Sequence, residues 1–181
     1  MQVKETYLKG CFVIEPKKFE DARGYFFESY NENKFAELTG SNIKFVQDNQ
    51  SYSTRGVVRG IHYQTGVHAQ AKLVRVLKGT VLDVAVDLRR DSSTFGKHYA
   101  IELSEENNRQ LYIPRGFGHG FSVLSETAEF FYKCDNFYNA VSEGGIIYND
   151  EELHIDWKVE DKYLNVSSKD LILPKFKNAK L

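Results

Sequence analysis

The sequence predicts an all-β fold, built as an antiparallel sandwich or barrel with a few short helices. Short runs rich in β-branched and aromatic residues recur along the chain, separated by turn sequences, as is typical of such folds. Aromatic residues make up 14% of the chain, with 13 Phe and 11 Tyr, and these side chains favour strands. The 181 residues contain no Gly/Ser tract and no repeat, so we expect one domain over residues 1–181.

The first half of the chain is expected to alternate strands with a single helix. Residues 32–39 have the composition of a short helix, for which Asn31 is a suitable N-cap and Gly40 a suitable C-terminal stop. Strands are expected on either side of this helix, in residues 10–19, 24–31, 44–53 and 56–64.

The second half contains a longer apolar segment. Residues 72–90 resemble a hairpin that turns at Lys78–Gly79. The second arm of this segment is apolar on both faces apart from Asp83 and Asp87, which favours a strand buried between two layers. Further strands are expected within 97–114, 119–126 and 128–138, and the tail 164–176 is expected to form a turn or short helix packed on the body.

Composition and charge exclude several functional classes. The chain has 24 basic and 25 acidic residues, a balance that gives no electrostatic footprint for nucleic acid or an anionic membrane. No apolar run approaches the roughly 18 residues of a membrane span, and the first residues lack the apolar core of a signal peptide. Cys11 and Cys134 are isolated in sequence. We therefore expect free thiols and a cytoplasmic location.

One motif points to a particular β architecture. Residues 113–121, "IPRGFGHGF", contain Pro-x-Gly-x-x-His, a turn that delivers His119 to the start of a strand. This pattern resembles the second half-motif of the cupin double-stranded β-helix, a type of jelly roll. In metal cupins the first half-motif supplies His-x-His and a Glu, whereas this chain offers His62-x-Gln64. A metal would lack the usual third protein ligand, so we expect no metal site.

His62 and Lys72 are the most informative pair in the segment "RGIHYQTGVHAQAKLV". If their strands line a barrel, both side chains point into one cavity, where a base beside a cation stabilises developing negative charge. Tyr132 is either a core residue or a proton donor aimed into the same cavity. Strand alternation groups His62 with Val58, Gly60 and Gln64, and places Arg59, Ile61 and Tyr63 on the opposite face.

Nine ordered segments, spread over nearly the whole chain, resemble the dTDP-4-dehydrorhamnose 3,5-epimerase family. They are "DARGYFFESY", "VQDNQSYS", "VVRGIHYQ", "AQAKLVRVLKGTVLDVAVDLR", "STFGKHYAIELS", "YIPRGFGHGF", "FFYKC", "SEGGIIYND" and "SSKD". The resemblance implies inversion at C3 and C5 of a dTDP-linked 4-keto-6-deoxy-glucose, without cofactor or metal, on the way to L-rhamnose. It also implies a homodimer in which N-terminal strands reach the partner's site.

The resemblance implies roles for individual residues. His62 would be the base that removes the protons at C5 and C3, with Asp170 holding its imidazole. Lys72 would stabilise the enolate oxygen at C4, and Tyr132 would protonate the opposite face. These residue types suit the chemistry, because enolisation needs a base active near neutral pH and a cation at the oxygen. Substrate contacts are implied for Arg23, Glu28, Gln47, Asp48, Asn49, Arg59, His119, Glu143 and Lys169.

Some positions depart from the family pattern. His68 lies in a loop and is expected to be solvent-exposed. Arg115 replaces an expected acidic residue, either as a surface change or as an added phosphate contact. Gly144 replaces an expected basic residue, so one substrate contact is expected to be absent. Arg59 is opposite His62 by strand alternation, and either a bulge at Gly60 or an arginine reaching around an edge would bring it to the site.

Three alternative functions remain open on the sequence. A mono-epimerase would invert only C5 or only C3 and would share the same reacting residues. A metal-dependent cupin enzyme would require a metal for activity. A catalytically silent nucleotide-sugar binding protein is disfavoured by the joint presence of His62, Lys72, Tyr132 and Asp170.

Overall fold

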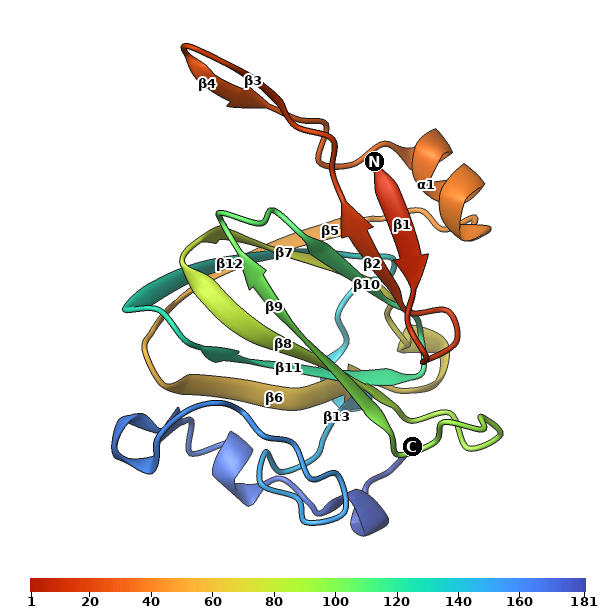
Figure 1. The fold of residues 1–181 in the computed structure, drawn as a ribbon. Coiled ribbons are helices and arrows are strands. Elements are labelled where there is room, and N and C mark those ends of the chain that lie inside the picture. The colour runs from red at the N-terminus through yellow and green to blue at the C-terminus, as the bar shows by residue number, and fades with distance from the viewer.

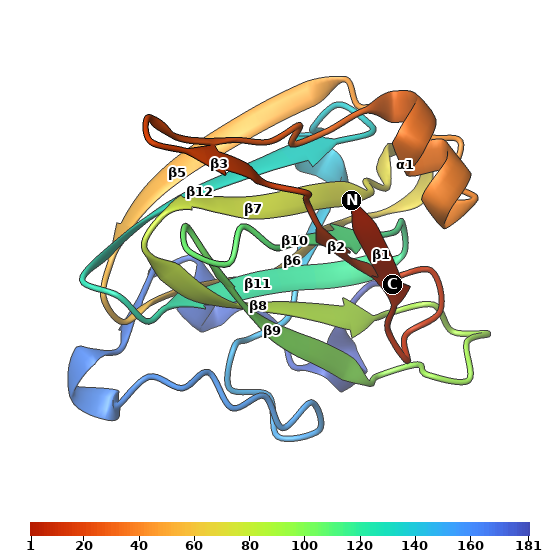
Figure 2. The ribbon, with the colours of Figure 1, turned by 45° about the horizontal axis from the view of Figure 1, so that its top comes forward.

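The computed structural model describes residues 1–181 (Figures 1 and 2). Six strands form one sheet: β1 (Gln2–Glu5), β2 (Phe12–Glu15), β5 (Gln47–Thr54), β7 (Lys72–Lys78), β10 (Gln110–Ile113) and β12 (Thr127–Cys134). The second sheet contains β6 (Val57–Gln64), β8 (Thr80–Asp87), β9 (His98–Ser104), β11 (Phe117–Val123), β13 (Glu143–Gly145) and β14 (Asn165–Val166). The helix is α1 (Glu32–Thr39), and 3₁₀ turns lie at Gly66–His68, Ala140–Ser142, Asp161–Tyr163, Asp170–Ile172 and Phe176–Asn178.

The two sheets face each other as the halves of a jelly roll. The first has the strand order β1-β2-β10-β7-β12-β5, and the second has the order β13-β6-β11-β8-β9. All these neighbours pair antiparallel, and only β14 runs parallel to its partner β6. The predicted all-β, cupin-like fold is confirmed. No helix has the length and apolar character required to span a bilayer.

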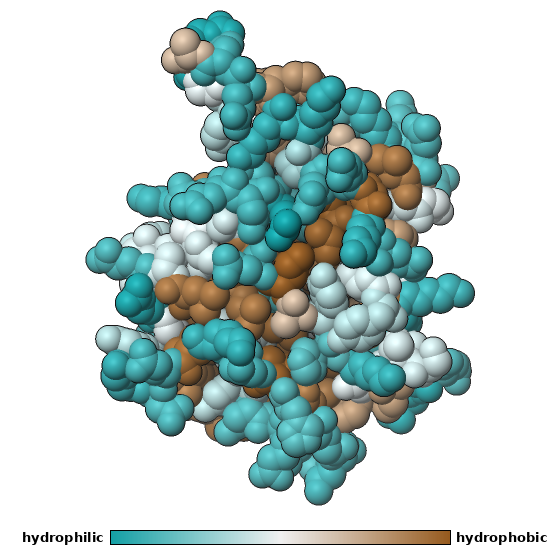
Figure 3. Space-filling model, viewed as in Figure 1, coloured by the Kyte–Doolittle hydropathy of each residue, from teal (hydrophilic) through white to brown (hydrophobic).

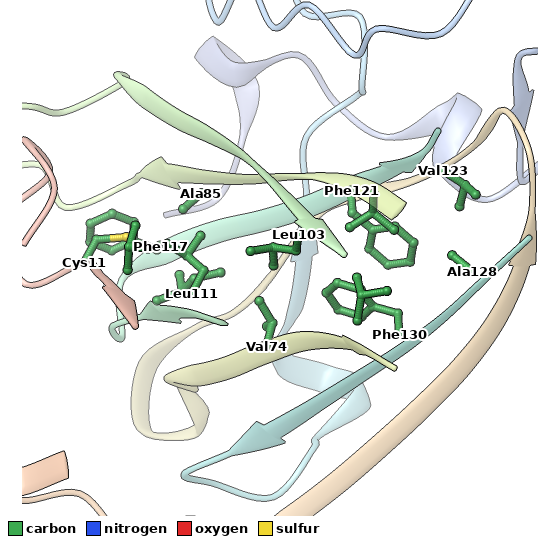
Figure 4. Packing of buried hydrophobic residues seen from close by; sticks show 14 of the residues in the cluster. Cys11, Val74, Ala85, Leu103, Leu111, Phe117, Phe121, Val123, Ala128 and Phe130 are labelled. Carbon is green, nitrogen blue, oxygen red and sulfur yellow. The ribbon is translucent and has the colours of Figure 1, made fainter. Parts of the chain in front are cut away.

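The core lies between the sheets. Figure 4 shows Val74, Leu111 and Phe130 of the first sheet packed against Phe121 and Ala85 of the second. A second apolar cluster fills the space between the outer face of the second sheet and the C-terminal segment, which runs below β6 in Figure 1. Strand β8 contributes to both clusters, so the prediction that it lies between two layers is confirmed.

Helix α1 begins and ends where the sequence predicts. The Asn31 side chain accepts a hydrogen bond from the backbone N–H of Lys34, and Gly40 ends the helix at φ +67°. Phe35 is buried and packs with Ile14 and Tyr112 on the outer face of the first sheet. The helix therefore covers that face and stays away from the barrel interior.

The predicted hairpin between residues 72 and 90 is wrong. Strand β7 pairs with β10 and β12, whereas β8 pairs with β9 and β11 in the other sheet. The turn at Gly79 thus carries the chain from one sheet to the other. A Cβ on Gly79 would lie 2.0 Å from the Thr127 carbonyl oxygen, and the residue has φ +79°, so both space and conformation require glycine. Turn chemistry alone does not reveal which sheet the second arm joins.

The N-terminal region also differs from the prediction. The strand expected over residues 24–31 is only β4 (Gly24–Phe26), which pairs with β3 (Phe19–Asp21) in a hairpin of its own. This hairpin extends away from the barrel in Figure 1 and stands clear of the body in Figure 3. Phe19, Tyr25 and Phe26 are all exposed on it. An isolated hairpin with exposed aromatic rings is marginal in water, which points to a missing contact.

Strand β6 contains a bulge at Gly60. His119 of β11 lies opposite His62, but Phe121, two residues on, lies opposite Arg59, three residues back. One extra residue in β6 therefore changes the alternation, and Val58, Ile61 and Tyr63 all pack on the outer side of the sheet. The expected grouping of Val58 with His62 is wrong for this reason. The bulge instead brings Arg59 to the same side as His62, as one of the two sequence-based explanations anticipates.

Replacing Gly60 by alanine is expected to lower both stability and activity. Gly60 has φ +110°, and a Cβ there would lie 2.6 Å from the His119 carbonyl oxygen and 2.8 Å from the Gly120 Cα. We expect a loss of about 2–3 kcal/mol in the free energy of unfolding, measured by urea denaturation. Gly66→Ala is the control, because Gly66 also has positive φ but no atom within 4 Å of its Cβ position. An equal loss in both variants would contradict the close approach of β6 and β11.

Candidate active site

The interior of the barrel opens into a group of cavities that meet at His62. One, of about 250 Å³, is lined by residues from five strands, among them Arg59, His62, Lys72, His119 and Tyr132. A second, of about 170 Å³, shares Asn49 with the first and adds Gln47, Gln64, Tyr138 and Glu143. A third, of about 530 Å³, lies toward the C-terminal segment and includes Glu143, Lys169 and Asp170. The fold thus gathers most of the candidate residues around one histidine.

His62 is held from behind by a carboxylate. Its Nε2 lies 2.8 Å from Oδ1 of Asp170, which is buried at the start of a 3₁₀ turn in the C-terminal segment. The other carboxylate oxygen accepts a hydrogen bond from the Gly60 backbone N–H at 3.3 Å. A carboxylate in this position fixes both the orientation and the tautomer of the ring, so that Nδ1 is the nitrogen available as a base.

Lys72 lies across the cavity from His62, and its ammonium group has no hydrogen-bond or ion-pair partner in the chain. Burial lowers the pKa of Lys72, while Cys134 and the negative charge of Asp83 act in the opposite direction. The Nζ atom lies 5.6 Å from the centre of the Tyr132 ring, so the ring face offers weak support to the charge. An unpartnered cation in such a place is available to a ligand oxygen.

Tyr132 supplies a hydroxyl group on the same cavity wall. It lies on the inward face of β12, beside Phe130, as the alternation of the strand predicts. Burial raises the pKa of Tyr132, so the hydroxyl remains protonated well above neutral pH and retains a proton to donate. A base, a cation and a neutral acid therefore line one small space.

His119 lies directly opposite His62 on the neighbouring strand and forms a second histidine–carboxylate pair. Its Nε2 lies 2.9 Å from Oδ2 of Asp83, and both side chains are buried. Burial lowers the pKa of His119, and Asp83 only partly offsets this effect. The ring also stacks on Phe130. Sequence reasoning missed Asp83, although an aspartate within a strand that is otherwise apolar was a usable signal.

The run from Gln47 to Asn49 divides between the two faces of β5. Gln47 and Asn49 point into the cavity, and the Asn49 amide donates to Cys134 Sγ. Asp48 points the other way and pairs with Lys133 at 2.9 Å. Within one chain, Asp48 therefore lines neither cavity, although a substrate contact is expected for it as for Gln47 and Asn49.

Two further candidates lie far from the cavity of their own chain. Arg23 is at the tip of the β3–β4 hairpin, where it pairs with Asp21 and is 90% exposed. Glu28 binds Lys34 and the Asn31 amide at the start of α1. A single chain thus does not bring these two residues to His62. If Arg23 and Glu28 contact the substrate, they must do so in another copy of the chain.

The positions that depart from the family pattern have local partners. His68 is half-buried and lies 2.9 Å from the Ser142 hydroxyl, so the expected solvent-exposed histidine is in fact held against another loop. Arg115 pairs with Asp135 at 2.7 Å and lines none of the three cavities. Gly144 is wedged against the Tyr63 ring. No group of three or more His, Cys, Asp or Glu side chains is arranged to hold a metal ion.

Comparison with known proteins identifies the family. The family model described as dTDP-4-dehydrorhamnose 3,5-epimerase matches residues 5–178. The chain belongs to the dTDP-4-dehydrorhamnose 3,5-epimerase family. A family member from Shigella flexneri, of that same name, is 50% identical over 179 residues, covering 99% of this chain and 98% of the relative.

Solved structures of the family match the fold closely. The crystal structure of dTDP-4-dehydrorhamnose 3,5-epimerase from Elizabethkingia anophelis has a TM-score of 0.95 and 61% identity, covering 98% of this chain and 97% of that one. A Legionella pneumophila dTDP-6-deoxy-D-glucose-3,5-epimerase, in complex with dTDP-4-keto-L-rhamnose, has a TM-score of 0.94 and 45% identity, covering 98% and 93%. The sequence-based assignment to this family is confirmed.

Proposed function

We propose that the protein epimerises C3 and C5 of dTDP-4-dehydro-6-deoxy-D-glucose and yields dTDP-4-dehydro-L-rhamnose. The observation that carries this proposal is the cavity in which His62, backed by Asp170, faces Lys72 and Tyr132. Family membership supports the same reaction, and a relative has been solved with dTDP-4-keto-L-rhamnose bound. Epimerisation beside a ketone removes and returns a proton without a change of oxidation state, so acid–base groups suffice.

Each half-reaction uses the three groups in turn. His62 accepts the proton from C5, and the electron pair of the broken C–H bond moves through the new C=C bond onto the C4 oxygen. Lys72 stabilises that enolate oxygen. Tyr132 then donates its proton to C5 from the opposite face while the C4 carbonyl re-forms. Exchange with solvent returns His62 and Tyr132 to their starting states, and the same sequence inverts C3.

The residues around the catalytic group suit the nucleotide and its diphosphate. Arg59 faces the cavity because of the bulge, and we assign its guanidinium to the diphosphate, for which a forked donor is well shaped. Gln47, Asn49 and His119 on the cavity wall, with Glu143 and Lys169 at its rim, are assigned to the rest of the substrate. Both cysteines are free and buried, which fits the cytoplasmic location that we propose.

Deuterium incorporation tests this function directly. The protein is incubated with dTDP-4-dehydro-6-deoxy-D-glucose in D₂O, and label is located by NMR and mass spectrometry. We expect deuterium at both C5 and C3. Label at one carbon only would identify a mono-epimerase. No label at either carbon would overturn the proposed function.

Tyr132→Phe is expected to separate proton exchange from inversion. The variant retains the base and the cation but lacks the hydroxyl proton, so the enolate forms and reverts. We expect product formation to fall by about 10²-fold, with a smaller loss of substrate deuteration. Both rates are measured in D₂O by NMR. An equal loss of the two rates would count against Tyr132 as the acid.

We further propose a homodimer in which the β3–β4 hairpin of one chain reaches the active site of its partner. The support is that Arg23 and Glu28 lie away from His62 in their own chain, on a projecting segment with exposed aromatic rings. A second copy of the chain would bury those rings and place Arg23 beside the partner's diphosphate site. Sedimentation of the wild-type protein is expected to give twice the chain mass.

Subunit complementation tests the exchanged arrangement. His62→Ala and Arg23→Ala proteins are each expected to be impaired alone. In a mixed dimer one site has both its own His62 and the partner's Arg23, so mixing is expected to restore about a quarter of wild-type activity after random exchange. Mixing His62→Ala with Asp170→Asn is the control, because both residues come from the same chain. No gain in the first mixture would contradict a site shared between chains.

A further inference from the structure

The most unusual buried group in the molecule is the carboxylate of Asp83. It lies at the middle of β8, fully buried between the sheets, and points to the barrel interior. Its Oδ2 meets His119, but its Oδ1 is the single buried side-chain oxygen or nitrogen in the chain without a hydrogen-bond partner. A carboxylate left half-satisfied in the core is costly, and the proposed reaction steps give it no role.

Asp87, on the same strand, shows how this fold satisfies a buried aspartate. Its two oxygens accept hydrogen bonds from the Arg89 guanidinium and from the hydroxyls of Ser92 and Thr94. Burial raises the pKa of Asp87, but these bonds outweigh burial and hold the pKa at about 2. Asp83 has no such set of donors. His119 is therefore the only side chain in direct contact that could balance a charge on Asp83.

Lys72 is the complementary group, a half-buried cation without a direct partner. The side chains that share its cavity are Tyr132 on β12, His62 and Arg59 on β6 and His119 on β11, while Cys134 on β12 and Asp83 on β8 act on its charge. Burial raises the pKa of the Cys134 thiol to about 11, so that group is neutral near pH 7. Asp170 is engaged by His62. Asp83 is thus the carboxylate left to act on Lys72, and its charge raises the lysine pKa against burial.

We propose that Asp83 is a positioning residue, which fixes the ring of His119 and supplies the negative charge that keeps Lys72 protonated. This inference rests on the proposed function for the role of Lys72 as the enolate-stabilising cation. Asp83 forms no ion pair with Lys72, so the ammonium group remains free to meet the substrate oxygen. At the same time the bond to Asp83 occupies Nε2 of His119 and leaves Nδ1 for a ligand.

The pH dependence of the reaction gives the expected signature. Lys72 must be protonated to stabilise the enolate, and its pKa is below the ordinary lysine value because of burial. Burial raises the pKa of Tyr132, so Lys72 loses its proton first and sets the alkaline limb of the rate profile. Asp83→Asn removes the negative charge but retains the shape. The alkaline limb should then move to lower pH by on the order of 1 unit.

The experiment compares Asp83→Asn with Asp87→Asn, a buried aspartate of the same strand outside the cavity. The rate profile is measured from pH 6 to 11, and the titration of ¹³Cε-labelled Lys72 is followed by NMR without substrate, the signal being assigned by its loss in Lys72→Met. We expect Asp83→Asn to lower the Lys72 midpoint and to shift the alkaline limb equally. Asp87→Asn should reduce the melting temperature and leave the midpoint in place.

The possible outcomes separate the two proposals. An unchanged Lys72 midpoint in Asp83→Asn, or an equal shift in both variants, would overturn the role of Asp83. Absence of turnover in the wild-type protein would overturn the function while the substrate-free titration still tests Asp83. If Asp83→Asn does not fold, the wild-type ¹³Cγ signal of Asp83 decides. Ionisation at pH 7 supports the inference, and a protonated Asp83 at that pH overturns it.

Discussion

His62→Ala is expected to abolish the incorporation of solvent deuterium at both C5 and C3. We expect no other group to replace it, because burial lowers the pKa of His119 and makes that ring a weaker base, and His68 lies in a loop against Ser142. A positioned base contributes about 10²–10⁴-fold to the rate, and loss of product formation of at least this size is expected. The measurement is NMR of the substrate incubated with each protein in D₂O.

Two further variants serve as comparisons for His62→Ala. Asp170→Asn retains the shape behind His62 but weakens its hold on the ring, so we expect partial loss of exchange. His68→Ala is the matched control, because it removes a histidine from the same segment that touches none of the reacting groups. Full exchange in His62→Ala, or a comparable loss in His68→Ala, would assign the base to another residue.

Lys72→Met is expected to have the second largest effect on the rate and only a small effect on stability. Methionine fills nearly the same volume but cannot stabilise an enolate oxygen, so we expect kcat to fall by about 10²–10³-fold. The half-buried ammonium group has no direct partner, so its removal relieves a desolvation cost but also takes away the positive charge nearest to Asp83. Because these two effects oppose each other, the melting temperature should change little. Steady-state kinetics and calorimetry measure the two effects.

The control for this variant lies on the same strand. Lys78 is exposed at the far end of β7, so Lys78→Met should leave both kcat and the melting temperature nearly unchanged. If Lys72→Met retained wild-type kcat, the developing charge at C4 would have to be stabilised elsewhere in the cavity. A marked loss of stability would show instead that the ammonium group is structural.

The features that local sequence patterns predict well are those fixed by near neighbours. The caps of α1 and the burial of β8 on both faces follow from a few adjacent residues. The sheet that each strand joins depends on distant pairing, which is why local patterns around Gly79 predict a hairpin where the chain instead crosses between sheets. The bulge in β6 is only partly predictable. Gly60 and the placement of Arg59 and His62 on opposite faces by strand alternation suggest a bulge, but an arginine that reaches around the sheet edge would explain them equally well.

The same distinction applies to the active site. Only the family resemblance linked His62 to Asp170, since 108 residues separate them in sequence. Spacing could not show that Asp48 turns outward to Lys133, which follows from the register of β5. Arg23 and Glu28 lie outside the site of their own chain. In our proposal they belong to the site of a second molecule, which the sequence of one chain does not reveal.

The carboxylate behind His62 comes from the C-terminal segment, which packs outside the second sheet. During synthesis, strands β1 to β13 all leave the ribosome before residue 170 does, and domains begin to fold from their N-terminal side. A nascent chain can thus close its barrel while the histidine still lacks its partner. Catalytic competence is then acquired at the end of translation, and a chain cut short after β13 would lack both this carboxylate and the C-terminal part of the second apolar cluster.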